Sequence, residues 1–154
     1  MFEKETAQIE AFVRDYKQVY GVDPLELKWC APCSNPNIPG TPQCGAVTKG
    51  KLIPKKYQSL FAGRAQVYLK VVLPRITNAY NYAICLHELG HVYTASRDEI
   101  TANRWARKHA LYWNQEMTNA ALDGMQTYVR DGLISHNDYF NFKWELESDG
   151  KKVA

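Results

Sequence analysis

The segment over residues 78–94 constrains the fold of this 154-residue chain most strongly, because it places two histidines one helical turn apart. It contains no proline and reads His-Glu-Leu-Gly-His from His87 to His91. Residues four apart on a helix lie one above the other on the same face. Two imidazoles so placed can each give a nitrogen to one cation at about 2.0–2.1 Å. We therefore expect a helix here with a metal-binding face.

Glu88 follows the first histidine of this motif directly. With 3.6 residues per turn it lies about 100° around the helix from His87, beside a metal rather than on it. From there a carboxylate can take a proton from a water molecule at the metal. Gly90 has no Cβ and would let another backbone come close. The alternative is a helix with two incidental histidines, because short motifs also occur by chance.

A catalytic zinc site has three protein ligands and an open position, so a third ligand has to come from elsewhere. The nearest downstream carboxylates are Asp98 and Glu99. On one unbroken helix Glu99 would lie about 12 Å beyond His91, too far to share an ion. We therefore predict a break and a second helix over 97–114, with Ser96 as its N-cap. Ser96 and Glu99 also fit a capping box, but we favour Glu99 as the ligand, with Asp98 as the alternative.

The remaining sequence predicts an α+β fold: a small, mostly N-terminal sheet packed on the motif helix, then a helical C-terminal half. The other expected helices cover residues 3–20, 116–131 and a last one capped by Ser135 that runs through Leu146. The expected strands are Leu25–Trp29, Ala46–Ile53 and Ala65–Leu73. The last strand could be an ordinary core strand or an edge to which a peptide adds. We expect one domain over residues 1–148 and a flexible tail over 149–154.

Charge and hydropathy exclude several function classes. A net charge of +3 does not by itself indicate a nucleic-acid surface. The basic run from Arg104 to His109 is more typical of a solvated helix face. No run of about 18 apolar residues is present, so we predict no membrane span. The polar start of the chain does not resemble a signal peptide, and we expect a cytoplasmic protein.

Three cysteines, Cys30, Cys33 and Cys44, lie in a segment that also contains four prolines. They could supply three thiolates to a structural metal, although a fourth ligand is missing nearby. Free thiols, or a disulfide formed on oxidation, are the alternatives. Cys85 precedes His87 by two residues, and we expect it on another face of the helix.

His87-Glu88-Leu89-Gly90-His91, followed by Glu99-x-x-Ala102-Asn103-x-Trp105-Ala106, resembles the pattern of the ImmA/IrrE family of metallopeptidases. This family is common in bacteria, phages and mobile elements, and its members often cleave a repressor or another regulator. The resemblance implies a compact zincin-like domain that acts on a protein or peptide. It further implies zinc ligands at His87, His91 and Glu99, a general base at Glu88, and a ligand-supporting role for Asn103.

These features together predict a zinc-dependent metallopeptidase. The alternative is a catalytically silent zincin-fold module that grips a protein partner, against which Glu88 argues because binding alone needs no base. Peptide hydrolysis also needs an electrophile besides the metal, usually a tyrosine or a histidine. The sequence does not choose among five candidates, which are Tyr93, Tyr112, Tyr139, His109 and His136.

Overall fold

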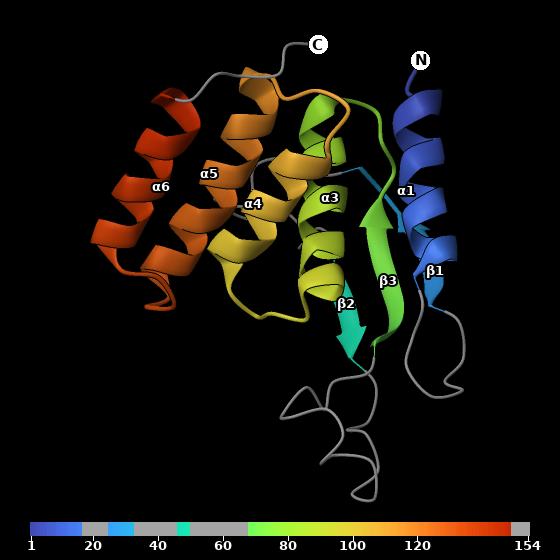
Figure 1. Ribbon diagram of the computed structural model, residues 1–154, viewed down its shortest axis with the longest axis horizontal. Coiled ribbons are helices and arrows are strands. Elements are labelled where there is room, and N and C mark those ends of the chain that lie inside the picture. Colours follow the sequence, from blue (N-terminus) through green and yellow to red (C-terminus); the bar gives the residue numbers. More distant parts are fainter. Residues whose placement is uncertain (17–24, 33–45, 50–67, 149–154) are drawn as a thin grey trace, which may run out of the picture.

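The computed structural model describes residues 1–16, 25–32, 46–49 and 68–148, which form an α+β arrangement (Figure 1). The helices are α1 (Glu3–Asp15), α3 (Ala79–Thr94), α4 (Glu99–His109), α5 (Gln115–Arg130) and α6 (His136–Ser148). The strands are β1 (Glu26–Cys30), β2 (Ala46–Lys49) and β3 (Tyr68–Pro74). Among the described residues, no helix combines the length and hydropathy needed to cross a bilayer. The predicted tail, 149–154, lies outside the described residues.

Strand β3 is the centre of a three-stranded sheet with the order β1-β3-β2. β1 pairs with β3 in parallel, and β2 pairs with it antiparallel. Val71 and Leu73 of β3 are fully buried in the core. Because β3 is paired on both sides, the expectation that this strand offers an edge to a peptide is wrong. It is a core strand, and residues 65–67 of the predicted strand lie outside the described residues.

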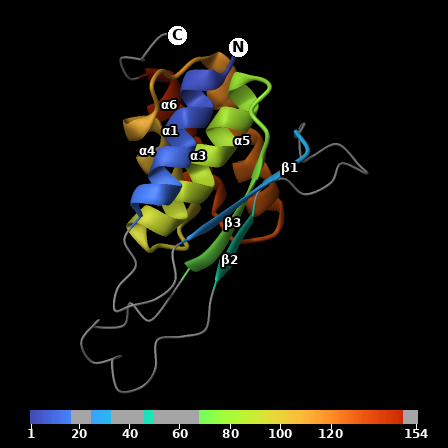
Figure 2. The same ribbon diagram turned by 90° about the vertical axis from the view of Figure 1, so that its right-hand side faces the viewer.

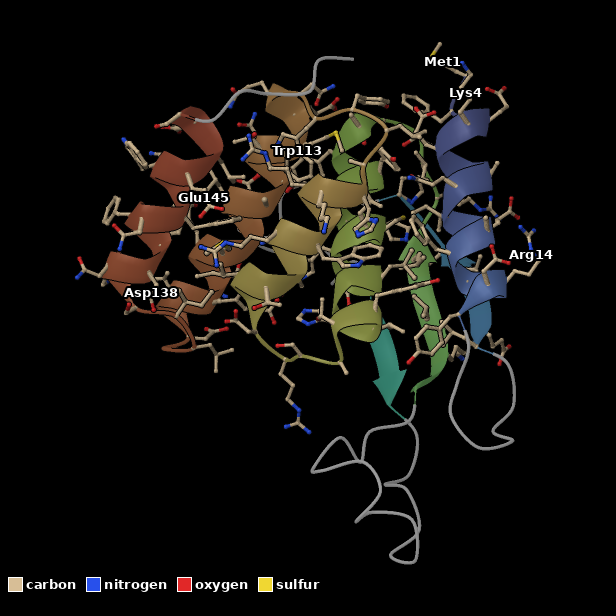
Figure 3. All side chains as sticks on the ribbon, in the orientation of Figure 1. Met1, Lys4, Arg14, Trp113, Asp138 and Glu145 are labelled. Carbon is tan, nitrogen blue, oxygen red and sulfur yellow. The ribbon has the colours of Figure 1, made fainter. Side chains whose placement is uncertain are left out.

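Helix α3 lies in the middle of the structure and contacts α1, β3, α4 and α5. Figure 2 shows α1 alongside it, and Figure 1 shows α4, α5 and α6 following on the other side. Its first turn is capped by Asn78, whose Oδ1 accepts a hydrogen bond from the Asn81 N–H at 2.9 Å. The core continues into the helical half, where Trp113, labelled in Figure 3, and Phe142 are buried. Burial around most of α3 fixes in place the helix that carries His87 and His91.

Two predicted helices end earlier than their periodicity suggests. α1 stops at Asp15 instead of residue 20, because Tyr16 is extended, with φ −65° and ψ 118°. α4 stops at His109 instead of residue 114. There the chain leaves the helix for tertiary hydrogen bonds, from Gln8 Nε2 to the His109 carbonyl at 2.7 Å and from the Leu111 N–H to a tyrosine hydroxyl. These partners come from distant elements, so local sequence does not reveal them.

The other helix ends in the C-terminal half follow the sequence closely. α5 covers Gln115–Arg130, one residue earlier at each end than predicted. Ser135 caps α6 as expected, since its Oγ accepts a hydrogen bond from the Asp138 N–H at 3.1 Å. An Asn114 side chain caps α5 in the same way. The Ser135 cap bonds within its own helix turn, which explains why the sequence locates it.

The predicted break after the motif helix is present. α3 ends at Thr94, and Ala95 adopts the left-handed conformation with φ 51° and ψ 33°. This residue reverses the chain, so that α4 packs back against α3. A left-handed conformation costs an L-residue about 1–2 kcal/mol, and glycine adopts it freely. The close pairing of α3 and α4 therefore depends on a strained residue.

We expect Ala95→Gly to raise the free energy of unfolding by about 0.5–1 kcal/mol, because relief of strain outweighs the greater entropy of unfolded glycine. Denaturant unfolding of the metal-free protein measures the change. Ala7→Gly, at an exposed position inside α1, is the matched control and should lower stability by about 1 kcal/mol. Equal destabilisation by both variants would contradict the strained turn.

Candidate metal centre

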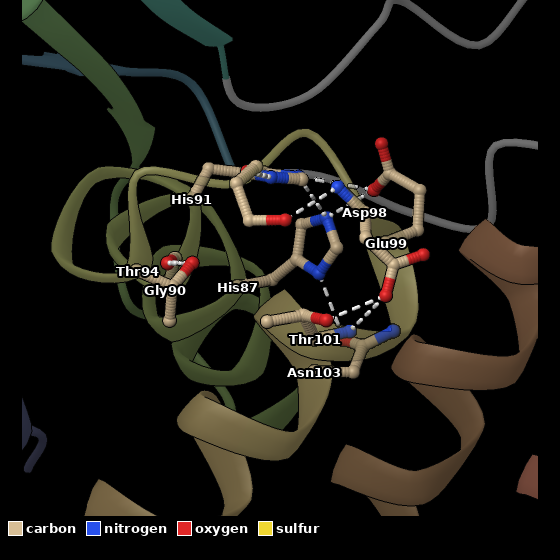
Figure 4. A network of polar contacts seen from close by, with 9 residues as sticks. His87, Gly90, His91, Thr94, Asp98, Glu99, Thr101 and Asn103 are labelled. Atoms are coloured by element: carbon tan, nitrogen blue, oxygen red, sulfur yellow. Dashed lines mark hydrogen bonds and ion pairs between the residues drawn. The ribbon is translucent and has the colours of Figure 1, made fainter. Parts of the chain in front are cut away.

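Three ligand atoms from α3 and α4 converge on one point (Figure 4). His87 Nε2 lies 2.8 Å and His91 Nε2 lies 3.0 Å from Glu99 Oε2. The two Nε2 atoms are 3.1 Å apart. The fold thus brings together the two motif histidines and the predicted third ligand, although Glu99 is eight residues beyond His91 in the chain.

The opposite ring nitrogens show how the imidazoles are protonated. His87 Nδ1 lies 2.8 Å from Asn103 Oδ1, and His91 Nδ1 lies 2.8 Å from the backbone carbonyl oxygen of Ser96. Both partners are acceptors, so each Nδ1 carries the hydrogen. In the neutral rings each Nε2 then presents a lone pair toward Glu99. Three electron-pair donors in such contact require a proton or a metal cation between them.

The geometry suits a metal ion. A tetrahedral site with bonds of about 2.0–2.1 Å separates its ligand atoms by about 3.3 Å, so these three atoms need to move apart by only tenths of an ångström. Two imidazoles and a carboxylate are typical donors for a divalent transition metal. The side chains of His87, His91 and Glu99 are 12%, 14% and 18% exposed, which leaves an approach from solvent. These three residues could therefore hold a metal ion.

Charge in the site shifts the pKa values of its carboxylates in opposite directions. Burial raises the pKa of Glu99, but hydrogen bonds and positive charge from His87 and His91, when these rings are protonated, outweigh this effect and lower it to about 2. Burial lowers the pKa of His91, and the Glu99 carboxylate more than reverses this shift. The pKa of Glu88 is raised because its burial outweighs the attraction of the two histidines. Glu99 thus stays anionic, while the Glu88 carboxyl holds its proton more strongly than an ordinary glutamate does.

Asp98 caps α4 and leaves Glu99 available as a ligand. Asp98 Oδ2 accepts a hydrogen bond from the Thr101 N–H at 2.9 Å, and the Asp98 N–H donates to Ser96 Oγ at 3.0 Å. The predicted N-cap at Ser96 is therefore wrong by two residues, and so is the helix start at residue 97. The capping box, in which Glu99 would bond back to Ser96, does not form, because Asp98 already supplies the cap.

We expect Glu99→Gln to abolish stoichiometric zinc binding, whereas Asp98→Asn keeps it. Glutamine retains the shape of Glu99 but loses the charge that draws the cation. Asparagine caps a helix about as well as aspartate, so the control preserves the start of α4. Metal analysis of the purified proteins and competition with a chromophoric chelator measure the difference. Loss of zinc from Asp98→Asn alone would reverse the assignment of the third ligand.

Gly90 lets α4 approach α3 at the site. A Cβ at this position would lie 2.5 Å from the backbone oxygen of Ala102 and 3.0 Å from its Cα. Ala102 is fully buried, so its backbone has no room to retreat. Glu99 lies one turn before this crossing on α4, and Asn103 directly follows it. The missing side chain therefore lets the α4 backbone that carries these two residues come close to α3, as the sequence predicts.

We expect Gly90→Ala to lower the free energy of unfolding by about 1–3 kcal/mol and to weaken zinc binding, because α4 has to move away. Denaturant unfolding and zinc competition measure the two effects. Gly124→Ala on α5 is the control, since a Cβ there meets nothing within 4 Å. That variant should gain about 0.5–1 kcal/mol from helix propensity and leave zinc binding unchanged. Normal zinc affinity in Gly90→Ala would contradict a backbone contact that sets the site.

The described cysteines lie away from this centre. Cys85 is fully buried, and its Sγ donates a hydrogen bond to the Pro74 carbonyl at 3.3 Å, toward β3. This confirms that it faces another side of α3. Cys30 ends β1 and is a free thiol. Cys33 and Cys44 lie outside the described residues, so the structural metal or disulfide at Cys30, Cys33 and Cys44 stays a prediction.

Several candidate electrophiles have partners elsewhere. Tyr93 donates to the Phe12 carbonyl at 2.6 Å, and Tyr112 donates to Glu5 at 2.7 Å. Tyr139 accepts a hydrogen bond from Gln126, His109 stacks on Trp105, and His136 begins α6. The basic run from Arg104 to His109 is partly paired, because Arg104 donates two hydrogen bonds to Glu145 at 3.1 and 2.8 Å.

Burial, and then the nearby negative charges of Glu99 and Glu88, raise the pKa of Tyr128 on α5. This tyrosine therefore lies near the two carboxylates, although it is not among the tyrosines and histidines predicted from the sequence. In the sequence it stands at the end of the apolar face that begins at Met117 and continues through Met125. Its place near Glu99 depends on the packing of α5 against α3, which local sequence does not reveal.

Comparisons of this chain with protein-family models, with curated proteins and with solved structures found no match. The resemblance to the ImmA/IrrE pattern therefore stays a prediction from the motif residues. Function has to be inferred from the chemistry of the site.

Proposed function

We propose that this chain is a zinc-dependent metallopeptidase. The observation that carries the proposal is the contact of two imidazole Nε2 atoms with one carboxylate oxygen at a site that remains partly exposed. A structural zinc site would be closed by four protein ligands. Within the part of the chain that the structure describes, three such ligands come together, which leaves a position for a reactant.

Each side chain of the site has a separate role in the proposed reaction. Zinc, when bound, polarises the scissile carbonyl and acidifies a water molecule. His87, His91 and Glu99 would hold the ion, and Asn103 and the Ser96 carbonyl would hold the two imidazoles in the tautomer that binds metal. Glu88 accepts the proton of the attacking water and passes it to the leaving amine. Its raised pKa suits a group that both accepts and releases a proton.

The arrangement of the elements supports a zincin-like fold, with the motif helix packed on a small sheet. Among the described strands, β2 pairs only with β3, so its other side is where we expect an extended peptide to add. The ImmA/IrrE-like motif further favours a regulatory protein as the substrate. We expect the reaction to take place in the cytoplasm of a bacterium or in a cell that carries a phage or mobile element.

We expect Glu88→Gln to bind zinc as the wild type does and to lower the rate of peptide hydrolysis by about 10²–10⁴-fold, the usual contribution of a general base. The zinc-loaded full chain is incubated with a proteome-derived peptide library, and new peptide ends are counted by mass spectrometry. Metal analysis of the same samples shows whether the variant retains zinc.

Two controls define this experiment. A chelator should stop cleavage by the wild type, and re-added zinc should restore it. His91→Ala should lose both zinc and activity. Cleavage by Glu88→Gln at the wild-type rate would contradict the mechanism. Stable zinc binding by the wild type, with binding but no turnover of peptides, would favour a module that grips a partner.

A further inference from the structure

Helix α6 carries apolar side chains on two opposite faces. Tyr139, Phe142 and Leu146 are buried against the rest of the protein. Phe140 is 59% exposed and Trp144 is 70% exposed, and because residues four apart share a helix face, both lie on the outer side. A helix that is apolar all round is typical of burial on both sides. In the part of the chain that the structure describes, this outer face stays open.

The two exposed rings form a defined patch at the edge of the molecule. Figure 1 shows α6 beyond α5, at the end of the helical half, where a large partner can reach it. Single exposed apolar residues are ordinary on protein surfaces, but an aromatic pair on one helix face is not. Among the described residues, the other exposed large apolar side chains all lie outside the helices: Met1, Leu111 and Leu133.

Polar and ionisable residues surround the two rings. With 3.6 residues per turn, the residues beside them on the outer face are uncharged: Asn137, Asn141 and Ser148. Ionisable side chains lie further round the helix, with His136, Lys143 and Glu147 on one flank and Asp138 and Glu145 on the other. An aromatic centre with a polar rim is the usual composition of a protein–protein interface.

Contacts inside the chain hold parts of this face in position. The Phe140 ring lies 5.4 Å from the Tyr139 ring at an angle of 72°, and the Tyr139 hydroxyl accepts a hydrogen bond from Gln126 at 3.0 Å. On one flank, Glu145 accepts two hydrogen bonds from Arg104. Side chains that are ordered before binding lose less entropy when a partner arrives.

The midpoint of α6 indicates which partner fits. The helix covers His136–Ser148, so Phe142 is its middle residue, and the two exposed rings lie two residues to either side. When two copies pack their α6 helices antiparallel about this midpoint, Phe140 lies level with Trp144 of the partner subunit. A two-fold axis makes this contact occur twice.

Charge on the flanks fits the same arrangement, because a two-fold axis brings the same flank of both helices together. His136 then lies about 1.5 Å along the axis from Glu147 of the partner subunit, again twice. Lys143 lies further round the helix, where its ammonium group can stay in water. Antiparallel helices also place the positive end of one macrodipole beside the negative end of the other.

The area of the patch suits a weak dimer. An aromatic side chain buries about 150–250 Å² in full, so the exposed parts of the four rings in a dimer amount to about 600 Å². The bordering polar residues bring the total to about 1,000 Å², the low end for a specific interface. A dissociation constant of about micromolar size is expected for such a contact.

We propose that the outer face of α6 is a homodimer interface, in which two α6 helices pack antiparallel with Phe140 of each copy against Trp144 of the other. The same patch on both copies closes the assembly as a dimer. The candidate metal ligands lie on α3 and α4, so this inference goes beyond the proposed function and does not depend on it.

The test uses two charge substitutions in the full chain. Phe140→Glu and Trp144→Lys each replace a central ring with a charge at both ends of the interface. Each should raise the dissociation constant of the dimer by about 100-fold or more, as for residues at the centre of an interface. Sedimentation equilibrium over a range of protein concentrations measures it. Leu111→Glu, which changes an exposed apolar residue outside α6, is the control and should leave the dimer unchanged.

A mixture of the two variants tests the antiparallel register. In a mixed dimer the new carboxylate at position 140 of one copy faces the new ammonium group at position 144 of the other. The remaining pair is the original Phe140 against the original Trp144. An equimolar mixture should therefore dimerise, although each variant alone stays monomeric. A parallel pairing would place each position opposite itself, and the mixture would not recover.

The outcomes decide for or against the dimer. A wild type that stays monomeric at about 100 µM would overturn the inference, since that is well above the expected dissociation constant. A dimer that survives Phe140→Glu, or a mixture that fails to associate, would overturn it as well. Because both replaced side chains are exposed, the variants should keep the wild-type zinc affinity and denaturant midpoint at low protein concentration. These readouts need no substrate, so they leave the peptidase proposal to its own test.

Discussion

Three electron-pair donors meet in this molecule with no hydrogen between them when both imidazoles are neutral. His87 Nε2, His91 Nε2 and Glu99 Oε2 lie within 2.8–3.1 Å of one another. Such a cluster repels itself unless a cation lies among its members. The folded chain tolerates this repulsion because the packing of α3, α4 and α5 determines where the three side chains lie. A site preorganised in this way could hold a metal without first having to reorder the chain.

The short connection after α3 makes this convergence possible. Along a continuous helix, residues 91 and 99 would be about 12 Å apart. The left-handed Ala95 turns the chain, Asp98 starts a new helix, and the missing side chain of Gly90 lets the two helices touch. A reversal, a cap and a small residue thus act together. Each of these three features is local in the sequence, but together they bring His91 into contact with Glu99, eight residues away.

The difference between local features and long-range contacts explains what the sequence could predict. The two histidines, the break after them, the two candidates for a third ligand and the α+β class all follow from local spacing and periodicity. The centre of the sheet could not be predicted, because strand order depends on which segments pair after the chain collapses. The N-cap of α4 was misplaced because Ser96, Asp98 and Glu99 compete for one role, and backbone geometry decides among them. Tyr128 was missed because its place near Glu99 depends on the packing of one helix against another.

The two acidic residues of the site show how the environment assigns different roles to the same functional group. Both carboxylates are partly buried and near the same two histidines. When the two rings are protonated, Glu99 receives a hydrogen bond from each, and its pKa falls to about 2. Burial prevails at Glu88, where the histidines act only through their charge, and its pKa rises. Carboxylates with opposite pKa shifts in one site are a recognised basis for dividing acid–base work. By the same reasoning, the anionic Glu99 is suited to hold a cation, and Glu88 is suited to move a proton beside it.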